Sequence, residues 1–269
     1  MVIALTPVDL VTAVALMLTS AGLSLFLSLG FHKGMVWASI RMVVQLLLVG
    51  SLLRLVFRQD SAALTVLIFL AMLTAAAHEV GARQPRRLQG GWRHLINGAA
   101  VSMSTIFVSA FALVTVLGAD NWLEPAHAIP IGGIILGTAM NSASIALNAL
   151  LSNIGNERDA IEAQLALGGS RFSALSPLMR RAVNAGIIPV MNQMVGAGII
   201  TMPGIMSGQI LAGQDPLNAA TYQVFLMLLL AASGTASAIF AVYFTVFRLS
   251  DERHRLRLDR LEDERRPKG

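Results

Sequence analysis

The sequence predicts an all-α, polytopic integral membrane protein with about seven membrane-spanning helices, and three observations support this fold class. Of its 269 residues, 55% are hydrophobic and 13% are charged, whereas soluble domains have about 25% charged residues. The mean hydropathy is +0.67. The few charges gather near residues 78–94, within residues 153–185 and after residue 248, and they leave long uncharged runs between them. This pattern excludes an ordinary soluble enzyme.

The uncharged runs predict the spans in order, because about 20 apolar residues cross a bilayer core as a helix. Six runs satisfy this length, at residues 10–32, 61–78, 94–119, 125–156, 182–214 and 216–247. A further span is expected at residues 35–57, where Arg41 and Gln45 interrupt an apolar stretch. Residues 1–247 are therefore expected to form a transmembrane domain that includes a polar segment at residues 153–185. Residues 248–269 are expected to form a charged cytoplasmic tail.

The basic residues predict the orientation of the spans. Lys and Arg gather in the loop near residues 83–93, in residues 153–185 and in the tail, whereas the loops near Glu124 and Asp215 lack them. The positive-inside rule then places the N-terminus outside and the C-terminus in the cytoplasm, although Arg54 and Arg58 are exceptions. Mixed charges around Leu256, Leu258 and Leu261 predict a solvated, frayed continuation of the last helix.

The net charge of +5 lies in segments that flank the predicted spans. We therefore expect membrane lipid, and no nucleic acid, as a partner. The chain has no cysteine, which excludes disulfides and thiolate metal ligands.

Residues 153–185 predict a short helix, a sharp turn and a second helix. Ile161, Leu165 and the Leu167-Gly168 pair recur at helical spacing. Gly168 and Gly169 follow as a helix-ending signal, because glycine tolerates the left-handed conformation after a helix. Ser170 can then cap the second helix.

The run EAQLALG at residues 162–168 resembles the EAA loop of ABC transporter permeases, although Gln164 stands where that motif has Ala. With residues 129–148, 157–171 and 202–223, and with Arg41 and Gln45, it is similar to the iron-export ABC permease family (FetB-like) and to plant aluminium-tolerance permeases. The resemblance implies a coupling helix that docks on a separate ATPase subunit through Glu162, Ala163, Gln164, Gly168 and Gly169. It also implies a homodimer of permeases with two ATP-binding subunits in the cell inner membrane, exporting iron.

ATP chemistry is expected on the partner. The two lysines, Lys33 and Lys268, lie outside any glycine-rich phosphate-binding loop. We therefore expect a transport subunit that is not itself an enzyme and carries no cofactor, with ATP and Mg bound by the partner.

Polar residues within the spans are candidates for a transport path, because unsatisfied polar groups are costly in lipid. Gly137, Asn141, Ser144 and Asn148 recur at three- and four-residue spacing and predict one polar face, which either lines a path or bonds neighbouring helices. Pro203 should kink or break the sixth span, as a gate or as a re-entrant turn. The candidate path residues are Arg41, Gln45, Asn141, Ser144, Asn148, Asn192, Gln193, Met202, Pro203 and Met206.

Several alternatives remain open. Arg41 has two possible roles: its side chain reaches the headgroups or a structural partner, or it contacts substrate. The methionines also have two, because they either fill the core or bind a soft metal. The predicted spans lack Asp and Glu beyond Asp9 at the first boundary, so no intramembrane carboxylate site for iron is expected and the metal ligands are unknown. The neutral path also suits a sugar nucleotide or another solute. An ion-gradient-driven secondary transporter would need acidic or histidine carriers within the spans, and a membrane scaffold would change no solute flux.

Overall fold

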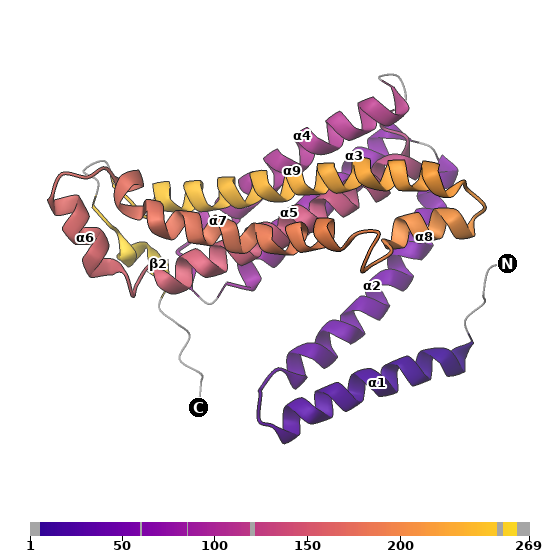
Figure 1. Cartoon of the computed structure of the whole chain (residues 1–269), viewed down its shortest axis with the longest axis horizontal. Helices are drawn as coiled ribbons and strands as arrows, with labels where there is room; N and C mark the ends of the chain where they lie inside the picture. Colours follow the sequence, from indigo (N-terminus) through magenta and orange to yellow (C-terminus); the bar gives the residue numbers. More distant parts are fainter. Residues whose placement is uncertain (1–5, 60, 85, 119–121, 252–254, 263–269) are drawn as a thin grey trace. The chain divides into compact units, whose positions relative to one another are not determined.

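The computed structural model describes residues 6–59, 61–84, 86–118, 122–251 and 255–262, and in this part the chain is almost entirely helical (Figure 1). It divides into two compact units, an N-terminal one ending at Asp60 and a second one starting at Ser61. The helices are α1 (Pro7–Phe26), α2 (His32–Gln59), α3 (Ala62–Ala82), α4 (Trp92–Leu117), α5 (Pro125–Asn153), α6 (Arg158–Ala166), α7 (Arg171–Gly196), α8 (Gly204–Leu211) and α9 (Pro216–Arg248).

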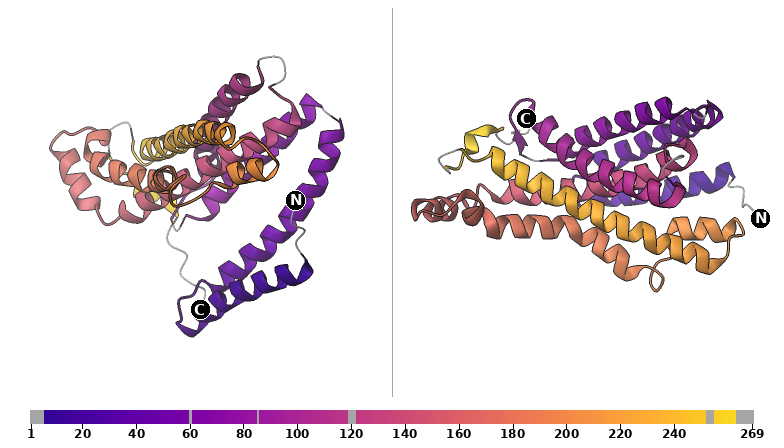
Figure 2. Two further views of the ribbon diagram at one scale, coloured as in Figure 1. Left: turned by 45° about the vertical axis from the view of Figure 1, so that its right-hand side comes forward. Right: turned by 90° about the horizontal axis from the view of Figure 1, so that it is seen from above.

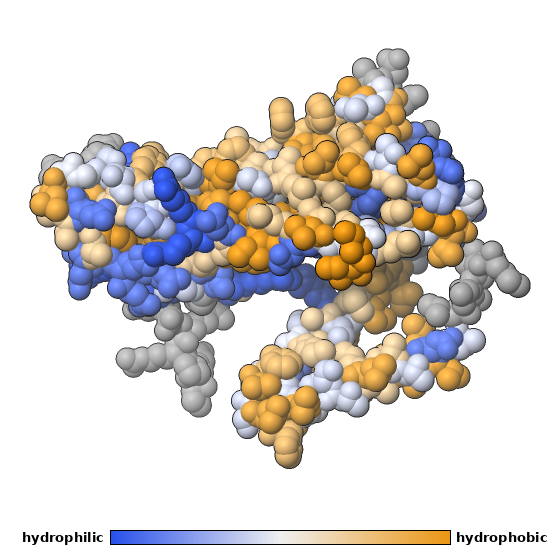
Figure 3. Space-filling model, in the orientation of Figure 1, coloured by the Kyte–Doolittle hydropathy of each residue, from blue (hydrophilic) through white to orange (hydrophobic). Residues whose placement is uncertain are grey.

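The all-α, polytopic prediction is confirmed. Among the described residues, six helices are long and apolar enough to cross a membrane: α1 from Val8, α2, α3, α4, α5 and α9. Apolar side chains cover much of the surface over these helices, while hydrophilic side chains gather around α6 (Figure 3). Such helices are stable in lipid because every backbone hydrogen bond closes within the helix.

The N-terminal unit is the hairpin of α1 and α2. It starts with a capping box, in which the Thr6 amide donates to the Asp9 carboxylate (2.8 Å) and the Asp9 amide donates to the Thr6 hydroxyl (3.4 Å). Most side chains of both helices are exposed and apolar within this unit. Helices that are apolar on all sides suit a lipid environment.

The second unit is built around α5, which packs against α3, α4, α7 and α9. Small residues permit this close packing. A Cβ atom on Gly186 of α7 would lie 2.6 Å from the Ser142 carbonyl oxygen and 2.9 Å from the Ala146 Cβ atom on α5. Glycine at this crossing lets the two backbones approach, as in other membrane helix pairs.

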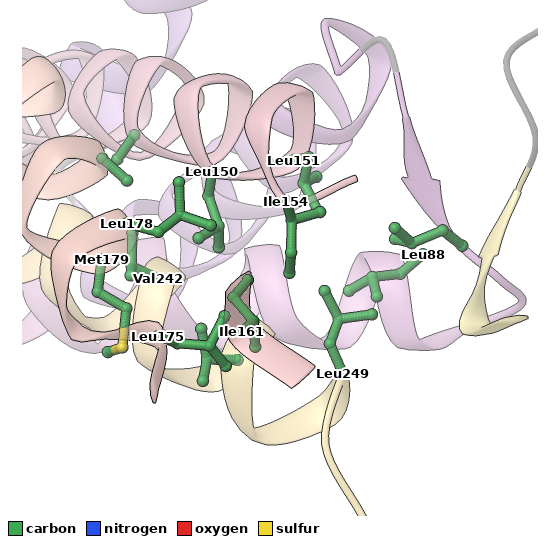
Figure 4. Close-up of a cluster of buried hydrophobic side chains, with 14 of the residues drawn as sticks. Leu88, Leu150, Leu151, Ile154, Ile161, Leu175, Leu178, Met179, Val242 and Leu249 are labelled. Carbon is green, nitrogen blue, oxygen red and sulfur yellow. The ribbon is translucent and has the colours of Figure 1, made fainter. Parts of the chain in front are cut away.

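A hydrophobic cluster closes one end of this unit (Figure 4). Ile154 at the end of α5, Ile161 of α6, Leu175 of α7 and Leu249 after α9 meet there, and Leu88 joins them from the loop between α3 and α4. The segment outside the spans is therefore held to the membrane helices by a shared apolar core.

The sixth predicted span is not one helix. α7 ends at Gly196, and α8 starts after Pro203, which occupies its N-cap position. The amides of Ile200 and Thr201 both donate to the Gly196 carbonyl at 2.9 Å, so the intervening loop closes on the end of α7. The predicted break is confirmed, but the helix ends before Pro203, because Ala197 is extended (ψ 129°) and Gly198 has φ +83°.

The described tail does not continue α9. After Arg248 the chain turns back, and β2 (Leu261–Glu262) pairs antiparallel with β1 (Arg87–Leu88). Leu256 and Leu258 pack against the hydrophobic cluster, and Leu261 is 9% exposed. The prediction of a solvated helical continuation is therefore wrong for residues 255–262, because these leucines gain more by covering the cluster than by extending a helix. Residues 252–254 and 263–269 of the predicted tail lie outside the described residues.

Candidate coupling segment and transport path

α6 lies at the end of the second unit, beyond the neighbouring ends of α5, α7 and α9 in both views of Figure 2. Ile161 holds it there: this side chain is 3% exposed and belongs to the hydrophobic cluster, and Leu165 packs beside it. Glu162, Ala163, Gln164 and Ala166 are exposed. One face of α6 therefore anchors the helix, and the rest of its surface is open.

The turn after α6 has the expected glycine geometry. Gly168 has φ +87°, its amide donates to the Leu165 carbonyl (3.0 Å), and the Gly169 amide donates to the Gln164 carbonyl (3.1 Å). These two bonds form a Schellman motif. A Cβ atom on Gly169 would lie 2.9 Å from the Gln164 carbonyl oxygen, so the second glycine is needed for the close approach.

α7 starts immediately after this turn. The Ser170 hydroxyl accepts a hydrogen bond from the Ser173 amide (3.3 Å), which caps the helix as the sequence predicts. The helix, turn and helix predicted within residues 153–185 are thus confirmed.

Ion pairs fix the start of α6. The Arg181 guanidinium of α7 donates to the Glu157 carboxylate at 2.6 Å, and Arg158 donates to Glu162 at 2.7 Å. The hydrogen bond to Glu162 raises the pKa of Arg158 above its usual value. Glu162 is therefore a paired surface carboxylate.

Leu167 does not lie on the packed side of α6 that Ile161 and Leu165 share. Its helical spacing grouped it with Ile161 and Leu165, yet it is 89% exposed at the tip of the segment. It occupies the C-cap position of α6, where the chain already turns away from the packed face. The signal available in the sequence was a leucine directly before the glycine pair that ends the helix.

A polar cavity of about 210 Å³ lies between α5 and α7. Gly137 and Asn141 of α5 and Gln193 of α7 line it, so the structure brings together two of the candidate path residues. Thr138, Ser142 and Pro189 also line it and were not predicted. Proline has no N–H to donate, so Pro189 leaves the Ala185 carbonyl without its helical partner beside this cavity.

The other candidate path residues lie elsewhere. Asn148 is exposed and accepts a hydrogen bond from Ser152 (3.3 Å). Ser144 is buried, so the expected single polar face holds for Gly137, Asn141 and Asn148 but not for Ser144. The reason is that α5 is enclosed by four helices, and Ser144 lies on a side that packs against them.

Asn192 on α7 and Met202 in the loop before α8 are exposed, and Met206 of α8 is half-buried. Pro203 starts α8. Arg41 and Gln45 lie on α2 in the N-terminal unit, where both are exposed.

The cavity contains amide and hydroxyl groups and no charged side chain among its lining residues. Among the described residues, no group of three or more His, Asp and Glu side chains is arranged to hold a metal ion. Neutral oxygens bind a hard cation weakly, which suits transient passage better than storage.

Comparison with known proteins places the chain among multi-pass membrane proteins. Residues 7–249 match the model of the uncharacterised protein family UPF0014. The UPF0014 membrane protein slr1647 of Synechocystis sp. is 36% identical over 222 residues, 82% of this chain and 84% of that protein.

Two further relatives have a similar extent. The probable iron export permease protein FetB of Escherichia coli is 30% identical over 236 residues, 87% of this chain and 88% of that protein. The UPF0014 membrane protein STAR2 of rice is 30% identical over 235 residues, 87% of this chain and 80% of that protein. No solved structure matches the chain significantly. The resemblance seen in the sequence is confirmed: the chain belongs to the UPF0014 family of membrane permeases.

Proposed function

We propose that this chain is the permease subunit of an ABC transporter in the cell inner membrane, that it exports iron, and that a separate ATP-binding subunit docks on α6. The observation that carries the proposal is the surface of α6. The helix is anchored through Ile161 and ends in Leu167, which is 89% exposed. An apolar anchor on a projecting helix is the usual way in which a helix binds a groove of a partner.

The connection from α6 to the membrane helices supports a coupling role. Ile161 is fixed in the hydrophobic cluster, and Glu157 is bonded to Arg181 of α7. The capped turn at Ser170 leads directly into α7, which has 26 residues and is therefore about 39 Å long. A displacement of α6 by a bound ATPase would thus be transmitted along one helix rather than absorbed by a flexible loop.

The far part of α7 explains how this displacement would affect a substrate. Pro189 and Gln193 line the polar cavity, and the helix ends at Gly196. Moving α7 against α5 would change the distance between Gln193 and Asn141. Alternating access in this proposal therefore consists of α7 opening and closing the polar cavity around the substrate.

Iron is proposed as the substrate because a relative 30% identical to this chain carries the name probable iron export permease. The neutral oxygens of Asn141, Ser142 and Gln193 would replace part of the hydration shell during passage. As two copies of the permease are proposed to work with two ATPase subunits, each copy would present its own α6.

The docking proposal is tested with Leu167→Glu, with Leu167→Met as the matched control. The chain would be expressed with a candidate ATP-binding subunit from the same organism, and co-purification and ATPase stimulation would be measured. We expect Leu167→Glu to reduce both at least tenfold at unchanged membrane abundance, and Leu167→Met to retain them. Wild-type association of Leu167→Glu would refute docking through α6.

The substrate is tested separately by the iron that cells retain after iron loading. We expect retained iron to rise in cells that lack the chain or carry Asn141→Leu. Asn141→Leu should still bind the ATPase, because Asn141 lies in the cavity and not on α6. Unchanged iron on loss of the chain would refute iron export while leaving the docking result intact.

A further inference from the structure

A second and larger cavity, of about 820 Å³, lies at the same end of the second unit as the hydrophobic cluster. Its walls come from the start of α4, the first residue of α7, the end of α9 and the chain after α9. None of its lining residues belongs to the polar cavity or to α6. Its volume lies within the range of known small-molecule sites.

Arginine dominates the charge of this cavity. Among the described lining residues, Arg171, Arg248, Arg255 and Arg260 stand beside one carboxylate, Asp251, which gives them a formal charge of 4 − 1 = +3. Asp251 accepts hydrogen bonds from the Arg255 amide (2.8 Å) and from its Nε atom (2.9 Å). The cavity therefore has an excess of cations, and an anion is its complementary ligand.

The arginine side chains are held in position. The guanidinium of Arg248 lies 4.5 Å from the ring centroid of Trp92, and that of Arg171 lies 4.7 Å from the centroid of Phe247. Arg260 donates to the carbonyls of Arg248 (2.6 Å) and Ser250 (3.3 Å). Stacking engages the flat face of a guanidinium, whereas phosphate oxygens are recognised at its edge.

Apart from Ser250, the rest of the lining is apolar, and part of it is exposed. Leu95 is 60% exposed and Phe247 is 61% exposed, while Ile96 is buried behind them. Trp92 is the first residue of α4 and Arg248 is the last residue of α9, and both helices are candidate spans. The cavity thus lies where two spans end, at the level where lipid headgroups and acyl chains meet.

We propose that this cavity binds an anionic phospholipid. The phosphate lies among Arg171, Arg248 and Arg260, and the first part of an acyl chain lies along Leu95 and Phe247. Basic pockets at the ends of membrane helices recognise acidic headgroups in this way. A free phosphate would use the arginines but would leave the exposed apolar wall without a ligand, so the lipid satisfies both halves of the cavity.

The test uses the full chain purified in a neutral detergent and titrated with phosphatidylglycerol, phosphatidylcholine or inorganic phosphate. Thermal unfolding and native mass spectrometry would be measured. We expect phosphatidylglycerol to raise the unfolding midpoint and to remain bound, and the other two to do neither at equal concentration. An equal shift with phosphatidylcholine would overturn the charge selectivity, and an equal shift with phosphate would overturn the assignment to a lipid.

Two variants locate the site. The double variant Arg171→Gln, Arg248→Gln should weaken phosphatidylglycerol binding at least tenfold. The control, Arg83→Gln with Arg158→Gln, removes the same charge from arginines outside the cavity and should bind like the wild type. Equal binding by both double variants would overturn the proposal. If the first variant does not fold, Leu95→Ser tests the apolar wall, and its unchanged lipid affinity would overturn the acyl-chain placement.

Discussion

α6 and the described tail, residues 255–262, are two short charged segments that pack on the same hydrophobic cluster but differ in how much of their remaining surface is exposed. Each buries apolar side chains there, Ile161 from α6 and Leu261 from the tail. α6 leaves its remaining faces open and ends in the exposed Leu167, whereas Leu256 and Leu258 of the tail are both partly buried. The difference indicates that the tail covers the cluster, while α6 keeps most of its surface exposed.

The largest expected effect comes from the anchors. Ile161→Ala should lower the free energy of unfolding by about 2–5 kcal/mol, because it leaves a cavity in a packed core. Leu261→Ala should cost about 2 kcal/mol, the low end of that range, because this side chain lies at the rim of the cluster. Thermal unfolding in detergent measures both.

Leu167→Ala is the matched control for the anchors. It should change stability by less than about 0.5 kcal/mol, as exposed substitutions do. A loss at Leu167 as large as that at Ile161 would contradict the distinction between an anchored and an open face.

Backbone strain at the turn should have the next largest effect. Gly168→Val forces a β-branched residue to adopt φ +87°, which should cost about 1–2 kcal/mol. Gly213→Val, after α8, is a matched control, because Gly213 has φ +95° and neither added Cβ meets an atom within 4 Å. Both variants should lose similar stability, but loss of ATPase stimulation should accompany Gly168→Val alone. Equal loss by both would contradict a specific role for the α6 turn.

The helix cap should matter less. Ser170→Ala removes the acceptor of the Ser173 amide and should cost about 1 kcal/mol. Ser170→Asp should retain the cap, since a carboxylate is also favourable at a helix N-terminus. Hydrogen exchange at the start of α7 would measure this, with faster exchange expected in the alanine variant and wild-type rates in the aspartate variant.

The smallest expected effect concerns the charges of the tail. Two hydrogen bonds from the Arg257 guanidinium, both 2.8 Å long, lower the pKa of Asp259 to about 2. Because the folded pKa lies below the unfolded value of about 3.9, this pairing stabilises the tail above about pH 4. The contribution should be lost as the pH falls to 2.

Carboxyl NMR would follow the titration of Asp259 directly. Arg257→Gln should raise the Asp259 pKa toward its usual value. An unchanged titration in that variant would show that the tail charges do not pair as described.

The sequence predicted features whose causes are local. Gly168 and Ser170 end one helix and start the next through bonds that span a few residues, so their pattern was sufficient. The tail was predicted wrongly because its partner is distant. The Gln89 side chain donates to the Leu261 carbonyl (3.2 Å) across a separation of 172 residues. No periodicity within the tail itself contains that information.

The candidate path was partly predictable for a similar reason. Polar residues on an apolar span stand out, and Asn141 and Gln193 do meet at the polar cavity. Helical spacing could not distinguish the open side of α5 from the side that holds Ser144, because small and apolar residues occur all around this helix. Which side packs is decided by the neighbouring helices.

The pairing of β1 with β2 also sets an order of events during synthesis. Leu88 emerges from the ribosome well before Leu261, and at about 5–20 residues per second the delay is roughly 9–35 s for the 172 residues between Gln89 and Leu261. Until then the apolar end formed by Leu88 and Ile154 lacks the cover of the tail. This apolar site is therefore exposed in a nascent chain, and it is covered only after Leu261 has been synthesised and has paired with the segment around Leu88.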